Sequence, residues 1–113
     1  MNADQFRRMA LALPEAVEGA HMGHADFRLR GKIFASLGPG GDWAMVKLTP
    51  AGQQACVDED EAAFEPFKGA WGRQGCTKIH LAPANRTMVR DALRDAWRNV
   101  APKRLRDEHD HEP

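Results

Sequence analysis

The stretch that decides the fold is Asp26–Leu48, which reads DFRLRGKIFASLGPGGDWAMVKL. Apolar and polar residues alternate over 26–30, 32–37 and 43–48, as they do in strands that bury one face. Gly31 and Lys32 predict a tight hairpin turn, and the segment GPGGD has the composition of a second turn. Three strands joined by short turns predict an antiparallel meander.

The segments on either side predict helices and further strands. Apolar residues recur with helical spacing over 3–13, and Pro14 ends that pattern. A short strand is expected over 18–22, a short helix begins at Thr49 and Pro50, and 76–81 alternates as the last strand. A broad apolar face over 85–101, with Leu93 and Trp97, predicts a long helix that completes the core. This order predicts an α+β fold, an antiparallel β-sheet with helices packed on one face.

Length and charge limit the organisation of the chain. A chain of 113 residues predicts one domain over 1–102, followed by a charged tail over 103–113 that is expected to be disordered. Sixteen basic and sixteen acidic residues cancel, so bulk charge does not point to nucleic acid. No apolar run is long enough for a membrane span, and the first residues do not form a signal peptide. The expected location is therefore cytoplasmic, with no membrane partner.

Strand parity sorts the side chains of the predicted sheet into two faces. The inward set is apolar and comprises Phe27, Leu29, Ile33, Ala35, Leu37, Ala44, Val46, Leu48, Ile79 and Leu81. The outward set is basic with interleaved aromatics and comprises Arg28, Arg30, Lys32, Phe34, Ser36, Trp43, Met45, Lys47, Lys78 and His80. Antiparallel sheets often carry polar residues on a solvated face. A basic and aromatic face also suits phosphate contacts with base stacking, or a protein interface.

The segment 66–75, PFKGAWGRQG, is punctuated by glycine and predicts a loop. Trp71 in this loop is either a plug in the core or an exposed platform for stacking. The plug is the favoured interpretation, because tryptophan is usually largely buried. Arg73 would then lie at the tip of the loop.

The arginines of the last predicted helix and the histidines near residue 22 do not predict a separate binding or metal site. Four arginines recur at every fourth position of the last predicted helix, at 86, 90, 94 and 98. Asp91 and Asp95 each precede an arginine by three residues, so two ion pairs and a solvated helix face are expected. His21 and His24 have metal-ligand spacing, but no acidic or thiol third ligand follows at the usual spacing, so no metal site is expected.

Motifs for catalysis are absent from the sequence. It contains no GxSxG, P-loop, HExxH or dinucleotide-binding fingerprint. Cys56 and Cys76 are expected to be free thiols. The chain is therefore expected not to be an enzyme, with no catalytic residues and no cofactor.

Four ordered segments carry a family resemblance: LALPEAVEGAHMGHADFRLRGKIFASLG, WAMVKLTP, GAWGRQGCTKIHL and DALRDAWRNVAPKRL. Over residues 6–105 the chain resembles the MmcQ/YjbR family. The resemblance implies a frataxin-like (CyaY-like) α+β sandwich and a "double wing" DNA-binding protein. It supplies no catalytic residues.

The functional prediction joins this resemblance to the basic face. The chain is predicted to bind duplex DNA weakly and in a salt-sensitive way, through Arg28, Arg30, Lys32, Lys47, Trp71, Arg73, Lys78 and His80, with the glycine-rich loop acting as a wing. The alternative is a module that binds a protein or a small ligand on the same face.

Overall fold

A single six-stranded sheet forms the centre of the computed structural model, which describes residues 1–110. In space the strand order is β1-β2-β3-β4-β6-β5, and every neighbouring pair is antiparallel. The strands are β1 (Val17–His21), β2 (His24–Leu29), β3 (Lys32–Leu37), β4 (Trp43–Lys47), β5 (Phe64–Pro66) and β6 (Cys76–His80). The predicted meander is the run β2-β3-β4, and the short strand expected at its N-terminal side is β1.

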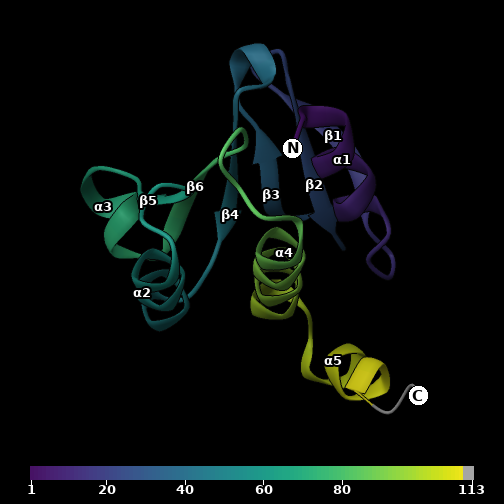
Figure 1. The fold of residues 1–113 in the computed structure, drawn as a ribbon. Coiled ribbons are helices and arrows are strands. Elements are labelled where there is room, and N and C mark those ends of the chain that lie inside the picture. The colour runs from purple at the N-terminus through teal and green to yellow at the C-terminus, as the bar shows by residue number, and fades with distance from the viewer. Residues whose placement is uncertain (111–113) are drawn as a thin grey trace.

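Within residues 1–110, five α-helices accompany the sheet. They are α1 (Ala3–Leu11), α2 (Pro50–Glu59), α3 (Gly69–Arg73), α4 (Arg86–Val100) and α5 (Lys103–Asp110), with one further 3-10 turn over Pro39–Gly41. Helices α1 and α4 lie on the same side of the sheet, across its central strands (Figure 1). The α+β class with helices on one face is therefore confirmed.

The long helices begin where the sequence places a capping side chain. Asn2 Oδ1 accepts a hydrogen bond from the Gln5 amide, and Gln5 Oε1 accepts one from the Asn2 amide, at 2.8 and 2.9 Å. Thr49 Oγ1 accepts from the Gly52 amide at 3.0 Å, with Pro50 in the first helical position. Each contact satisfies an amide that the first helical turn leaves without a partner.

Both hairpins in the first half of the sheet close through two-residue turns with positive φ. These turns are Met22-Gly23, with φ of 51° and 86°, and Arg30-Gly31, with φ of 49° and 82°. Positive φ at both central residues is typical of the type I′ turn, whose twist matches that of the flanking strands. Arg30 therefore lies in a turn, and its predicted place on the outward strand face is wrong.

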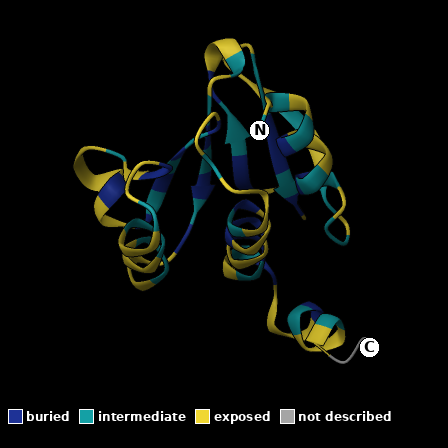
Figure 2. Cartoon of the chain, viewed as in Figure 1, coloured by how far each residue is buried: buried dark blue, intermediate teal, exposed yellow. Residues whose placement is uncertain are grey.

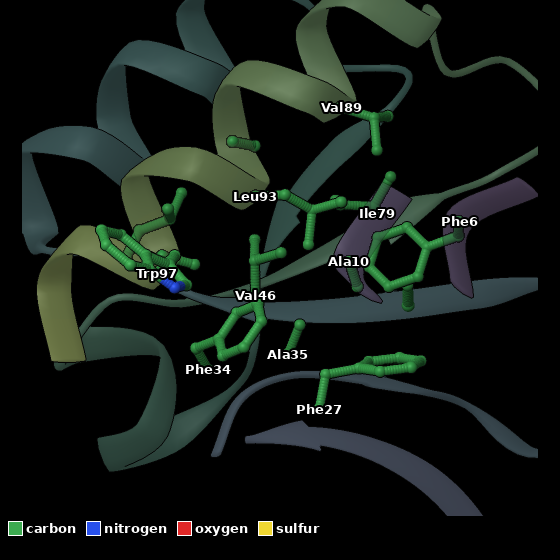
Figure 3. Packing of buried hydrophobic residues seen from close by; sticks show 14 of the residues in the cluster. Phe6, Ala10, Phe27, Phe34, Ala35, Val46, Ile79, Val89, Leu93 and Trp97 are labelled. Carbon is green, nitrogen blue, oxygen red and sulfur yellow. The ribbon is translucent and has the colours of Figure 1, made fainter. Parts of the chain in front are cut away.

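The core fills the space between the sheet and helices α1 and α4. Buried residues lie on the strands and on the sides of these helices that face them (Figure 2). Leu93 of α4 points toward Val46 and Ile79 of the sheet (Figure 3). Trp97 is completely buried, and its Nε1 donates a hydrogen bond to the Pro14 carbonyl at 2.9 Å. The predicted long helix thus completes the core as expected.

An irregularity in β3 reverses three of the predicted side-chain directions. The register between β2 and β3 shifts between Phe27 and Arg28, so that Phe27 lies opposite Ala35 whereas Arg28 lies opposite Ile33. The extra residue, Phe34, is 0% exposed and packs beside Ala35 and Val46 (Figure 3). Ile33 consequently moves to the outer face, and Lys32, which lies opposite the buried Leu29, is not on the outer face as predicted. Simple alternation missed this because a bulge places two consecutive residues against one partner.

Two segments that were expected to be irregular are helical. The predicted loop over 66–75 contains α3, and the predicted disordered tail contains α5 over Lys103–Asp110. Leu105 of α5 is buried, and Arg98 of α4 forms an ion pair with Asp110. Tertiary contacts therefore order this charged segment, while residues 111–113 lie outside the described part of the chain. Within residues 1–110, every helix is too short or too polar to cross a membrane.

A candidate binding cleft on the outer face of the sheet

The face of the sheet opposite α1 and α4, here called the outer face, presents a continuous row of polar and apolar side chains. Strand pairing aligns the row across five strands, in the order Asp26, Ser36, Met45, Lys78 and Glu65. On either side of Met45, Trp43 lies opposite His80 and Lys47 opposite Cys76. Period-two alternation in β4 and β6 therefore places these groups as the sequence predicted.

The outer face is hollowed into a cleft of about 400 Å³. It extends from the β1–β2 hairpin, across β3 and β4, to helix α3. Its apolar walls are Ile33, Trp43, Met45, Phe67 and Trp71. Its polar lining includes His21, His24, Ser36, Lys47 and Gln74. Large apolar walls with a few polar groups are typical of sites for small molecules, which commonly enclose about 300–1,000 Å³.

The aromatic wall of the cleft is built in two ways. Trp43 packs edge to face on Phe67, with ring centroids 5.8 Å apart. Its ring also lies on the backbone of Gly38, where an added Cβ would come within 2.2 Å of Trp43 Cε2. Trp71, in contrast, is 66% exposed at the mouth of the cleft. The favoured interpretation of Trp71 as a core plug is therefore wrong, because the short helix α3 turns its side chain outward.

A buried ion pair occupies the β2 end of the cleft. Asp26 is only 1% exposed, and it accepts hydrogen bonds from Arg28 Nε at 2.7 Å and from a terminal guanidinium nitrogen at 2.9 Å. Gly19 of β1 leaves room for the pair, since a Cβ there would come within 2.8 Å of Asp26 Oδ1. The Arg28 hydrogen bond holds the pKa of Asp26 below its usual value. Arg28 is therefore paired with Asp26, and together they add little net charge to the outer face.

Two more of the predicted binding residues are also paired with acids. Arg30 donates to both carboxylate oxygens of Glu15, at 3.1 and 3.2 Å. His80 Nε2 lies 2.8 Å from Glu65 Oε1, and this hydrogen bond lowers the pKa of Glu65. At both of these positions the predicted basic side chain therefore contacts an acid, which a phosphate would have to displace.

The remaining predicted cations differ in their surroundings. Lys78 Nζ lies 4.9 Å from the Trp43 ring centroid and 5.4 Å from that of Phe67. Lys47 lines the cleft, and its ammonium group forms no ion pair within residues 1–110. Lys32 and Arg73 are exposed but line no part of the cleft. Of the eight predicted residues, only Lys47 and Trp71 line it.

Two histidines and a cysteine complete the polar lining. His21 and His24 lie opposite each other beside the hairpin turn, and His24 Nδ1 is buried with no hydrogen-bond partner in the described chain. No three His, Cys, Asp or Glu side chains of residues 1–110 are grouped so that they could hold a metal ion. Cys56 and Cys76 are free thiols, and burial raises the pKa of Cys76.

The arginine stripe of α4 lies away from the cleft. Arg86, Arg90 and Arg94 are exposed and form no ion pair within the described residues. Arg98 pairs with Asp110 of α5 instead of Asp95. The two ion pairs predicted within α4 are therefore wrong. Helix α5 supplies the acid for Arg98, and this contact lies beyond the reach of spacing rules within one helix.

The sequence placed Ser36, Trp43 and Met45 on the outer face, with the aromatics suited to stacking, but these three residues were not among the predicted binding residues. Parity alone placed them together, and their mixture of rings and small polar groups was the available signal for a ligand cleft. Phe67 and Gln74 carried no such signal, because the helical turn that brings them to the cleft was not predicted.

Comparison with protein-family models gives a match. The family model described as YjbR matches residues 11–99, which is most of the chain. No match was found among curated proteins.

Proposed function

The chain belongs to the YjbR family, and we propose that it is a non-catalytic binding module whose outer cleft takes a small ligand. The observation that carries the proposal is the cleft itself. Its cavity of about 400 Å³ is walled by Trp43, Phe67 and Trp71 on the outer face of the sheet, and its lining also includes Asn99 of α4. A ligand with an apolar body would remove these rings from water, which favours binding.

The acidic partners of the basic side chains support a small ligand over duplex DNA at this site. Arg28, Arg30 and His80 each have an acidic partner. Duplex binding would need such cations to face phosphates, and breaking their pairs would offset part of the gain. A small molecule can instead enter the cleft without disturbing these pairs.

A neutral fluorescent probe tests the proposal. N-phenyl-1-naphthylamine should brighten on binding to the native chain, because the cleft removes it from water. Trp71→Ala should weaken binding several-fold, since the exposed ring forms one wall. Val17→Ala is the matched control, because Val17 is 56% exposed and does not line the cleft. Absence of binding, or equal binding by the native chain and Trp71→Ala, would contradict the proposal.

Nucleic-acid binding is the second candidate, and the arginine stripe of α4 is the observation that favours it. Three arginines without ion pairs in the described chain recur at helical steps of about 6 Å, at Arg86, Arg90 and Arg94. Contacts with three phosphates would give a slope of log K against log salt of about −3. This candidate moves the predicted DNA contacts from the sheet to α4.

An anisotropy titration with a duplex oligonucleotide across a salt series shows whether DNA contacts the arginines of α4 or the outer face of the sheet. Arg90→Gln with Arg94→Gln should reduce the slope by about 2, whereas Lys47→Met should leave it unchanged. A slope that falls with Lys47→Met alone would return the contact to the sheet. No binding at low salt would remove the nucleic-acid candidate.

A further inference from the structure

The charge of the outer cleft limits the ligand that it can take. Asp26 is the acidic residue in the lining, and both of its oxygens accept hydrogen bonds from Arg28. Burial raises the pKa of the Cys76 thiol, so this side chain stays uncharged near neutral pH. Lys47 therefore keeps an uncompensated positive charge in the cleft.

The surroundings of Lys47 strengthen its role as an anion partner. Lys78 lies over the Trp43 ring at 4.9 Å but outside the lining and opposite Glu65, so Lys47 is the lysine that the cleft itself presents. Ser36 and Gln74 also line the cleft, and neither side chain makes a hydrogen bond within residues 1–110. One ammonium group with two free hydrogen-bonding side chains suits a carboxylate better than a neutral or cationic group.

The aromatic residues set the other half of the ligand. Trp71 makes no ring contact in the described chain, although it is 66% exposed at the cleft mouth. Trp43 and Phe67 already contact each other edge to face. A planar ring that stacks on Trp71 would bury this indole and gain the offset geometry that aromatic pairs prefer.

We infer that the ligand of the outer cleft is a planar aromatic carboxylate, with its ring against Trp71 and Trp43 and its anionic group at Lys47. This inference rests on the proposed small-ligand function and names the class of ligand. The volume of about 400 Å³ is near the lower end for ligand sites, so a ligand of a few fused or linked rings fits.

Two isosteric probes separate charge from ring binding in calorimetric titrations. 2-Naphthoate and 2-naphthamide share a ring system and differ in charge. We expect the naphthoate to bind the native chain about tenfold more tightly, the lower end for hydrogen bonds to charged groups, because the cleft is open to solvent. Lys47→Met should abolish this difference by weakening the naphthoate alone, and Lys47→Arg should retain it.

Matched variants make the outcomes distinct. Lys32→Met removes an exposed lysine outside the cleft and should leave both affinities unchanged. Trp71→Ala should weaken both compounds to a similar degree. Equal binding of the two compounds by the native chain, or equal losses of both in Lys47→Met, would overturn the aromatic-carboxylate assignment alone. Binding of neither compound would overturn the small-ligand function as well.

Discussion

The two faces of the sheet share the same strands but place different demands on their side chains. In β4, Ala44 and Val46 point into the core and are completely buried. The alternate residues of the same strand, Trp43, Met45 and Lys47, line the cleft. The inner face is filled by α1 and α4. The outer face keeps large rings in contact with solvent, where they contribute less to stability and remain available for a ligand.

The three tryptophans express this difference most clearly. Trp97 is completely buried and hydrogen-bonded, Trp43 is partly buried in the cleft wall, and Trp71 is 66% exposed. The residue type is the same in each case. Removing the Trp97 ring should therefore cost the most stability, whereas removing the Trp71 ring should cost the most ligand affinity.

Trp97→Ala should give the largest loss of stability. Removing this buried ring leaves a cavity and an unpaired Pro14 carbonyl, with an expected cost of about 3–5 kcal/mol. The measurement is the midpoint of urea unfolding followed by circular dichroism. A midpoint equal to that of the native chain would show that α4 does not complete the core.

Leu105→Ala extends the comparison to α5. Leu105 is 6% exposed, and truncating a buried leucine costs about 2–3 kcal/mol when the site lies at the edge of a core. The same unfolding assay applies, with the exposed neighbour Arg104→Ala as the control. Equal midpoints for the two variants would restore the prediction of an undocked tail.

Asp26→Asn tests the ion pair at the β2 end of the outer face. Near neutral pH the loss should be about 1–2 kcal/mol, because Arg28 loses its charged partner but can reach solvent. The folded-state pKa of Asp26 is lowered, so its stabilising contribution is present above the unfolded value of about 4 and is lost as pH falls through the folded value. The difference between the native chain and Asp26→Asn should therefore shrink in acid. A constant difference down to the acid limit would contradict this pairing.

Trp71→Ala and Lys47→Met should have the smallest effects on folding. Both side chains lie on the outer face without a hydrogen bond or ion pair in the described residues, so stability should change by about 0.5 kcal/mol or less. The denaturation midpoints of these variants check this expectation directly. A loss comparable with that of Trp97→Ala would mean that the cleft walls are structural.

Local signals allowed much of the fold to be predicted. The caps at Asn2, Thr49 and Asn85 act within three residues of their partners, so the sequence alone reveals them. Alternation in 43–48 and 76–80 likewise depends only on backbone geometry. The α+β class followed from the order of these segments and is confirmed.

Non-local contacts account for the parts that could not be predicted. The bulge that buries Phe34 depends on the pairing of β2 with β3. The pairing of Arg30 with Glu15 joins residues on either side of β1 and β2. Leu105 is ordered by the rest of the fold, since the composition of its segment resembles that of a disordered tail. The cleft was missed for the same reason, because α3 brings Trp71 and Gln74 to a face built by distant strands.

The central claim is that the inner face of the sheet forms the core while the outer face binds a ligand. Its most direct test is a titration of the ¹⁵N-labelled chain with 2-naphthoate, followed through the three indole N–H signals. The signals of Trp71 and Trp43 should shift progressively with ligand, because both rings line the cleft. The signal of Trp97 should stay in place, because its Nε1 is held by Pro14 on the opposite side of the sheet. A shift of Trp97 alone, or no shift of Trp71 and Trp43, would contradict the account.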